Sequence, residues 1–130
     1  MEEDYVSFKT AKLLKKRGFD EPCRYFYDDD GRGIIYAVKF KNSDRIMPEN
    51  YCACPTQFIL VKWFREKFNI IISVYKTRTM NNSYNYVILN NDDWDNLIKQ
   101  NCRQGRSYSQ AMEDGFNVAL KLLKDNKGKS

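Results

Sequence analysis

The sequence predicts a single α+β domain: a two-layer sandwich with an antiparallel four-stranded sheet and helices on one face. Its 130 residues are the size of one domain. Segments with apolar residues at helical spacing alternate with pairs of short β-branched or aromatic segments, in the order α-β-β-α-β-β-α. Strands that follow one another directly favour antiparallel hairpins in one sheet. We expect the domain to span residues 1–124 and residues 125–130 to form a flexible basic tail.

The first half of the chain contains one predicted helix and one predicted hairpin. Ser7 is a good N-cap, and Gly18 can take the left-handed conformation that ends a helix. The pair Asp30-Gly31 is a common hairpin turn between two strands. The expected elements are a helix over 6–18, a strand over 23–27, a turn over 28–33, a strand over 34–40 and a polar connection over 41–54.

The second half repeats this order and adds a long helix. Thr56 or Cys54 can cap the second helix, whereas Ser107 and Gln110 have the spacing of a capping box. Gly115 lies in the apolar stripe of the last helix and therefore predicts close approach to another backbone. The expected elements are a helix from Pro55 to Asn69, strands over 70–75 and 86–89, a short helix over 92–98 and a long helix from Ser107.

Composition excludes several classes of protein. The chain contains no histidine, which excludes histidine-based triads, histidine general bases and histidine-ligated metals. No segment approaches the roughly 18 consecutive apolar residues of a membrane helix. The acidic start Met1-Glu2-Glu3-Asp4 lacks the basic residues and apolar run of a signal peptide, so we expect a cytoplasmic protein with reduced cysteines.

No catalytic residue, metal site or cofactor is predicted. The Cys52-Ala53-Cys54 segment, with Cys23 and Cys102, could form a four-cysteine zinc site, but zinc knuckles use pairs separated by two residues. Buried thiols are therefore the favoured interpretation. The Asp28–Asp30 run resembles the start of a calcium loop, but it lacks the distal glutamate, which favours a hairpin turn. We expect a protein without enzymatic activity.

Tyrosines on the predicted strands are the most suggestive functional feature. If helices cover one face of the sheet, some of these rings lie on the other face beside cations from the same strands. Such a surface could stack the bases of a single-stranded nucleic acid, or bind a partner protein or a second copy of the chain. Cross-strand packing in the core is the third interpretation. The candidate binding residues are Arg24, Tyr25, Tyr27, Tyr36, Lys39, Arg65, Lys67, Tyr75, Lys76, Arg78 and Tyr86.

Three motifs together carry a family resemblance that covers most of the chain. They are SFKTAKLLKKRGF from Ser7, CPTQFILVKWFREKF from Cys54 with the following IIISVY, and SYSQAMEDGFNVALKLL from Ser107. This pattern resembles a group of short bacteriophage and prophage proteins with no established activity. The resemblance implies a phage or mobile-element accessory protein in the bacterial cytoplasm, and it transfers no catalytic residue.

The expected function is therefore a non-enzymatic module that binds a host or phage protein, a ligand or a second copy of itself. The alternative is a nucleic-acid-binding protein that uses the strand tyrosines and the basic segments 61–78 and 103–129. No membrane partner and no cofactor are expected.

Overall fold

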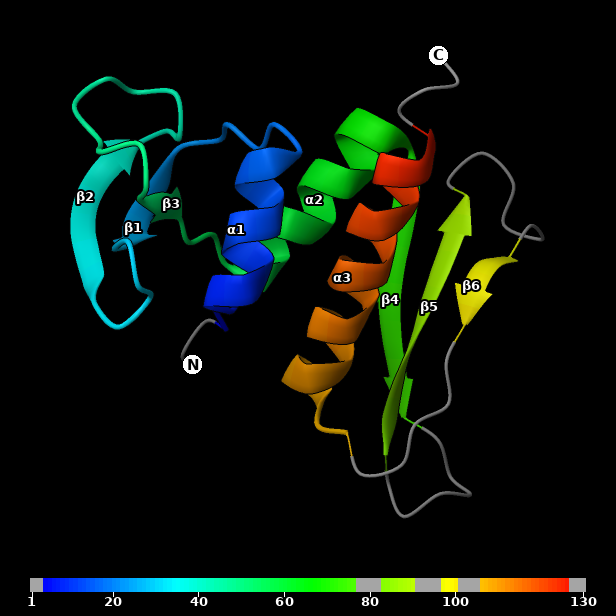
Figure 1. Ribbon diagram of the computed structural model, residues 1–130. Coiled ribbons are helices and arrows are strands. Elements are labelled where there is room, and N and C mark those ends of the chain that lie inside the picture. The colour runs from blue at the N-terminus through cyan, green and yellow to red at the C-terminus, as the bar shows by residue number, and fades with distance from the viewer. Residues whose placement is uncertain (1–3, 77–82, 91–96, 101–105, 127–130) are drawn as a thin grey trace.

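The computed structural model describes residues 4–76, 83–90, 97–100 and 106–126, and they form an α+β fold (Figure 1). The predicted fold class is therefore confirmed. The elements are α1 (Phe8–Lys16), β1 (Cys23–Tyr27), β2 (Ile34–Phe40), β3 (Cys52–Ala53), α2 (Gln57–Phe68), β4 (Ile70–Lys76), β5 (Tyr84–Asn90), β6 (Leu97–Gln100) and α3 (Tyr108–Asn126).

The strands form two antiparallel sheets instead of the expected four-stranded sheet. One sheet has the order β2-β1-β3, and the other has the order β4-β5-β6. Figure 1 shows the three helices between the two sheets, with α3 along β4 and β5 and α1 beside β3. The expected sandwich with helices on one face of a single sheet is not confirmed. Each hairpin has one further strand: β3 pairs with the free edge of β1, and β6 pairs with the free edge of β5.

Helix α1 begins and ends as its sequence predicts. Ser7 accepts a hydrogen bond from the Thr10 amide through its side chain, at 3.2 Å. Gly18 has a φ of 87°, and the following Phe19 amide returns to the Leu14 carbonyl at 3.0 Å. This left-handed end turns Phe19 back into the core, where it is 1% exposed.

A polar network joins α1 to α3. The Glu113 carboxylate accepts hydrogen bonds from the Ser7 amide and the Thr10 hydroxyl. The Asn117 amide group donates to Thr10 Oγ1 at 3.0 Å and to the Glu113 carbonyl at 2.7 Å. The network satisfies the hydroxyl of Thr10, which is fully buried, and it thereby fixes how α1 lies on α3.

The β1–β2 hairpin closes through the predicted acidic turn. The Gly31 amide donates to the Asp28 carbonyl at 3.2 Å, and the Arg32 amide donates to Asp30 Oδ1 at 3.0 Å. Gly31 has a φ of 74°, and a Cβ built on it would lie 2.2 Å from the Phe8 ring. Glycine is required at this position both for the backbone conformation and for the contact with α1.

The connection after β2 contains one strand that the sequence pattern does not reveal. Residues 41–51 are irregular, but Cys52 pairs with Tyr27 and Ala53 pairs with Phe26. Thr56 then caps α2 by accepting from the Ile59 amide at 3.2 Å, and Asn69 ends α2 in the left-handed conformation. Of the two predicted caps, Thr56 is therefore the one that the structure uses.

The second sheet differs from the prediction at its last strand. Strands β4 and β5 pair in regular register over seven residues each, slightly longer than predicted. Leu97 and Ile98 belong to β6, although the sequence predicted a helix over 92–98. The capping pattern at Asp92–Trp94 suggested that helix, and residues 91–96 lie outside the described residues. Pairing with β5 overrides the local helical pattern at Leu97 and Ile98.

Helix α3 confirms the predicted capping box, but Gly115 lies close to side chains and not to another backbone as predicted. The Ser107 amide donates to Gln110 Oε1 at 3.0 Å, and the Gln110 amide donates to Ser107 Oγ at 3.2 Å. A Cβ on Gly115 would lie 3.0 Å from the Ile72 side chain and 3.2 Å from Tyr86 Cβ, so the close neighbours are side chains of β4 and β5. The helix continues to Asn126, which includes the first two residues of the predicted tail, and residues 127–130 lie outside the described part.

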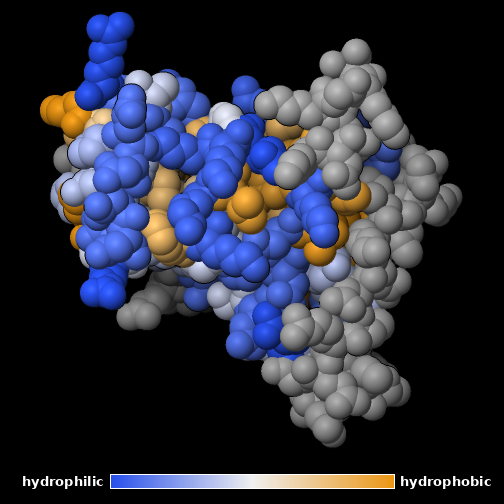
Figure 2. Space-filling view, viewed as in Figure 1, coloured by the Kyte–Doolittle hydropathy of each residue, from blue (hydrophilic) through white to orange (hydrophobic). Residues whose placement is uncertain are grey.

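One hydrophobic core runs through the helices and both sheets. Its largest fully buried side chains include Phe19, Phe26, Phe64 and Phe116. Figure 2 shows hydrophilic residues over most of the described surface in this view, with apolar side chains visible between them. None of the described helices is long and apolar enough to cross a lipid bilayer.

Candidate functional site

The first sheet brings two predicted tyrosines together on adjacent strands. Tyr25 on β1 pairs with Tyr36 on β2, and their ring centroids lie 5.7 Å apart at an angle of 62°. Tyr5, which the sequence did not single out, extends this pair: its ring lies 5.4 Å from that of Tyr25 at 86°. Tyr36 is 62% exposed and Tyr5 is 40% exposed, so this row of rings reaches solvent.

Two predicted cations lie in an irregular part of the hairpin and share a cavity with Tyr5. Between the pairs Cys23–Phe40 and Tyr25–Tyr36, β1 has one residue and β2 has three. Arg24 and Lys39 both lie in this irregular stretch of the hairpin. Arg24 and Lys39 line one cavity of about 430 Å³, which we call the Arg24–Lys39 cavity; its other lining residues are Tyr5, Pro22, Cys23, Cys54, Pro55, Thr56 and Ile59.

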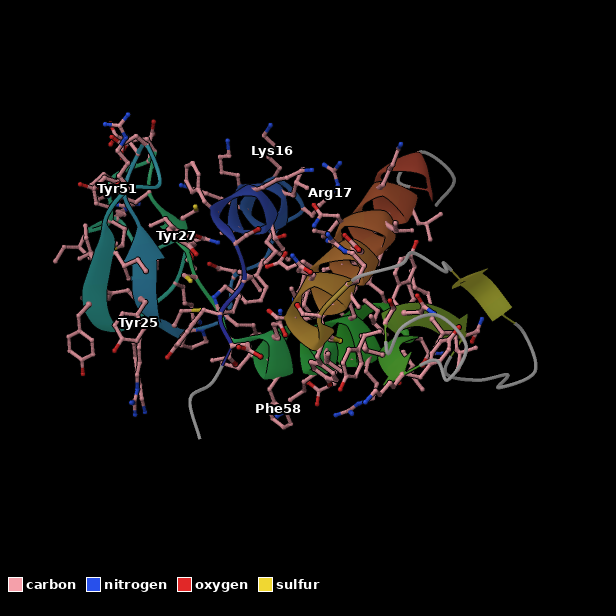
Figure 3. The ribbon with its side chains drawn as sticks, turned by 90° about the horizontal axis from the view of Figure 1, so that it is seen from below. Lys16, Arg17, Tyr25, Tyr27, Tyr51 and Phe58 are labelled. Carbon is pink, nitrogen blue, oxygen red and sulfur yellow. The ribbon has the colours of Figure 1, made fainter. Side chains whose placement is uncertain are left out.

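Tyr27 has a structural role and does not belong to the exposed rings. Its hydroxyl donates a hydrogen bond to the Val6 carbonyl at 2.6 Å, and its ring packs against Phe8 at 5.5 Å. Burial raises the pKa of Tyr27 above its usual range, with a contribution from its hydrogen bond to Cys54. Figure 3 shows Tyr27 between the hairpin and α1, which it helps to hold together.

The remaining predicted tyrosines lie in the other sheet. Tyr86 is 3% exposed and packs under Gly115 of α3, so it belongs to the core. Tyr75 is half-buried and follows Val74, the partner of Tyr86, so it points to the opposite face of that sheet. The five strand tyrosines therefore belong to two sheets and do not share one face.

The basic residues of the predicted segment 61–78 also lie elsewhere. Arg65 and Lys67 are exposed in the last turn of α2, whereas the Arg24–Lys39 cavity borders its first turn at Thr56 and Ile59. Ile59 and Lys67 are eight positions apart on α2, which corresponds to about 12 Å along the helix axis. Lys76 is exposed at the end of β4, and Arg78 lies outside the described residues. The cations thus form no continuous stripe within the described structure.

The described thiols have the properties of core residues. Cys23, Cys52 and Cys54 are free and buried, and Cys102 lies outside the described residues. Burial raises the pKa of Cys23 to about 12 and that of Cys54 to about 11, and it also raises the pKa of Cys52. Because the thiolate is the reactive form, these thiols are poor nucleophiles at neutral pH.

Only one described group of acidic or sulfur ligands is close enough to hold a metal ion. The carboxylate oxygens of Asp28, Asp29 and Asp30 lie within 4.8 Å of one another. Hydrogen bonds with Asp30 and with backbone groups of the turn lower the pKa of Asp28. Asp28 and Asp30 take part in the predicted hairpin turn, in which Asp28 Oδ1 is buried without a hydrogen-bond partner. The three described cysteines do not form such a group.

A second hollow lies between the first turn of α2, strand β4 and the first turn of α3. We call this cavity of about 580 Å³ the α2–α3 groove; its lining residues are Asp4, Thr56, Gln57, Phe58, Val61, Ile72, Ser73, Val74, Tyr108 and Met112. Phe58 is 77% exposed, and Figure 3 shows its ring pointing away from α2. Gln57 Nε2 donates to the Ser109 carbonyl at 3.2 Å and to Ser109 Oγ at 3.1 Å, which fixes the two helix starts relative to each other.

The position of Phe58 in the sequence is one signal for this groove. Phe58 falls outside the apolar stripe that Leu60 and Phe64 define on α2, so a helix packed through that stripe leaves Phe58 in solvent. Tyr108, which is 49% exposed, contacts Tyr84 edge to face at 5.6 Å. The contribution of Asp4 depends on the tertiary fold and has no sequence signal.

Comparison with known proteins gives no relative. No family model, no curated protein and no solved structure matches this chain. The geometry of the two hollows is therefore the basis for a functional proposal.

Proposed function

We propose that this chain is a non-enzymatic module that binds an apolar segment of a partner protein in the α2–α3 groove. The observation that carries the proposal is Phe58, a phenyl side chain that is 77% exposed at a groove. Large exposed aromatic side chains beside a concave surface are typical anchors of protein interfaces. The hydrogen bonds from Gln57 to Ser109 hold the groove open in a fixed shape before a partner binds.

The chemistry of the groove favours a particular kind of segment. Phe58, Val61, Val74 and Met112 supply apolar contacts, and Asp4 is the one charged residue among the groove's described lining residues. A segment with a large apolar side chain and a nearby lysine or arginine complements both features. Charge complementarity at Asp4 therefore favours a basic-apolar segment over an acidic one.

Selection from a library of random 12-residue peptides tests this proposal. The selected peptides should share one large apolar residue next to a basic residue. Calorimetry should show that Phe58→Ala weakens their binding about tenfold or more, because truncation of a central aromatic anchor removes much of the binding energy. Ile46→Ala is the matched control, since Ile46 is 71% exposed in the loop after β2 and lies outside the groove.

Equal affinity of the selected peptides for the wild-type chain and Phe58→Ala contradicts the proposal. So does a selection that yields no peptide with saturable binding. A loss of affinity in the Ile46→Ala control assigns the binding to another surface.

The biological setting is also a proposal. The resemblance of the Ser7, Cys54 and Ser107 motifs to short phage and prophage proteins supports an accessory role in the bacterial cytoplasm. A host protein, a phage protein or a second copy of the chain could supply the apolar segment.

A nucleic-acid-binding function is the second candidate, with a smaller footprint than the sequence suggested. The exposed rings of Tyr5 and Tyr36 and the cations Arg24 and Lys39 support it. Two cations predict a slope of about −1.4 for the logarithm of single-strand affinity against the logarithm of salt concentration, at about −0.7 for each phosphate.

Fluorescence anisotropy with single-stranded DNA and RNA at several salt concentrations measures this slope. Arg24→Ala should reduce its magnitude by about 0.7, and Arg65→Ala, in the last turn of α2, should leave it unchanged. Identical slopes for the wild-type chain and Arg24→Ala contradict this second candidate.

A further inference from the structure

The Arg24–Lys39 cavity carries a concentrated positive charge. Arg24 and Lys39 both line it, and like charges that share a cavity repel each other. The cavity's described lining contains no aspartate or glutamate, and no carboxylate in the described part of the chain forms an ion pair with either cation. An anion bound between the two side chains removes this repulsion.

The thiols that line the cavity add no negative charge to compete with such an anion. Cys23 and Cys54 line the cavity, and burial keeps both thiols protonated at neutral pH. Thr56, the N-cap of α2, also lines it, so the positive end of the α2 dipole faces the same space. The site therefore favours a ligand with more than one negative charge.

The walls of the cavity are suited to a flat organic group. Tyr5 contributes a ring that is 40% exposed, and Pro22, Pro55 and Ile59 contribute rigid apolar surface. A volume of about 430 Å³ is in the range of small-ligand sites and is larger than an inorganic oxyanion needs. Aromatic and apolar surfaces beside an arginine are the usual environment of a nucleobase next to its phosphate.

We propose that the Arg24–Lys39 cavity binds a nucleoside monophosphate, with the phosphate between Arg24 and Lys39 and the base against Tyr5. The guanidinium of Arg24 binds two phosphate oxygens in a bidentate manner, while Lys39 supplies a point charge. The inference rests on the second candidate function and specifies its ligand as a single nucleotide. This nucleotide is either free or the phosphorylated end of a strand. It is independent of peptide binding in the α2–α3 groove, although Thr56 borders both hollows.

Calorimetric titration with adenosine monophosphate tests the proposal, with adenosine, inorganic phosphate and phenyl phosphate as comparison ligands. Adenosine monophosphate should bind at least about tenfold more tightly than each of the other three, because only it engages both the cations and the apolar wall. Comparable affinity of adenosine overturns the role of the phosphate. Comparable affinity of inorganic phosphate or phenyl phosphate overturns the nucleoside assignment, and so does the absence of saturable binding of adenosine monophosphate.

Substitutions in the cavity test the assignment of residues. Arg24→Gln and Lys39→Gln should each weaken adenosine monophosphate binding about tenfold or more, since each removes a charge-assisted contact. Tyr5→Ala should weaken binding, and Tyr5→Phe, which keeps the ring, should restore it. Arg65→Gln and Lys67→Gln are matched controls on an exposed surface of α2. Unchanged binding in Arg24→Gln or Lys39→Gln overturns the site, and a circular dichroism spectrum confirms that each variant is folded.

Two oligonucleotides distinguish the source of the nucleotide. Tighter binding of a 5′-phosphorylated strand than of adenosine monophosphate assigns the site to a strand end, and equal binding assigns it to a free nucleotide. If an unphosphorylated strand binds and adenosine monophosphate does not, the nucleotide site is overturned and the nucleic-acid candidate stands.

Discussion

Replacing Phe64 by alanine should lower the free energy of unfolding by about 3–5 kcal/mol. Phe64 is fully buried in α2, where it stacks on Phe116 of α3 with ring centroids 6.1 Å apart and an angle of 10°. Its ring also contacts Trp63 at 5.1 Å, and Trp63 contacts Phe19 at 5.2 Å. The substitution leaves a cavity where α2, α3 and the end of α1 meet, and these helices hold both sheets.

Urea denaturation of Phe64→Ala measures this loss, and a melting temperature lower by on the order of 10–20 °C should accompany it. Phe58→Ala is a matched control, because it removes the same side chain from the same helix at a position that is 77% exposed. We expect Phe58→Ala to change stability by no more than about 0.5 kcal/mol. A loss below about 1 kcal/mol in Phe64→Ala contradicts the described packing of α2 on α3.

The contrast between Phe58 and Phe64 also explains why peptide binding and stability are separable in this chain. Phe64 stabilises the helix pair from inside, whereas Phe58 contacts the core little and is available to a partner. A folded Phe58→Ala variant without peptide binding therefore reports on the groove itself. By contrast, Phe64→Ala should affect the groove only through loss of the fold.

Local signals were sufficient to predict where most helices and strands begin and end. Ser7, Thr56 and Ser107 act as N-caps, and each accepts from the amide three residues later. The strand bounds at Cys23–Tyr27 and Ile34–Phe40 agree with the prediction, because the acidic turn between them defines the hairpin. These signals act within a few residues, and tertiary contacts do not override them at these three caps and at this hairpin.

The pairing of strands could not be predicted from the same signals. β3 consists of Cys52 and Ala53 alone, and two residues contain no alternating pattern. Its pairing with β1 depends on the bridge between Tyr5 and Thr56 and on the amide of Val6, which donates to the Pro55 carbonyl at 3.1 Å. These contacts join segments about 50 residues apart in the sequence. The two hairpins lie in separate sheets, and each sheet has one short third strand.

Only the part of the candidate site that depends on local pairing could be predicted from the sequence. Arg24, Tyr25, Tyr36 and Lys39 come together because they lie on one hairpin, whose pairing is local. Tyr75 and Tyr86 are predicted near these residues only if all strands form one sheet. They lie in the other sheet and therefore do not belong to this site. Tyr5 joins the site through the long-range bridge to Thr56, so neither its ring contact nor its place in the cavity follows from sequence spacing.

Gly115→Leu should destabilise the chain by about 3 kcal/mol, because it forces α3 away from the second sheet. A Cβ at this position already meets Ile72 Cγ2 at 3.0 Å and Tyr86 Cβ at 3.2 Å, and both neighbours are 3% exposed. The larger side chain has no free space on this face of α3. Ile72 and Met112 also line the α2–α3 groove, so the displacement should reach the peptide site.

Two variants of α3 separate this steric effect from helix propensity. Gly115→Ala adds only the Cβ, and the roughly 1 kcal/mol that alanine gains over glycine in a helix should offset most of the crowding. Lys121→Leu places the same leucine on the exposed side of α3 and should have little effect. We therefore expect a difference of about 3 kcal/mol between Gly115→Leu and Gly115→Ala in urea denaturation. If the two variants are equally stable, α3 does not lie against Ile72 and Tyr86 through Gly115, and the shape of the α2–α3 groove no longer follows from that contact.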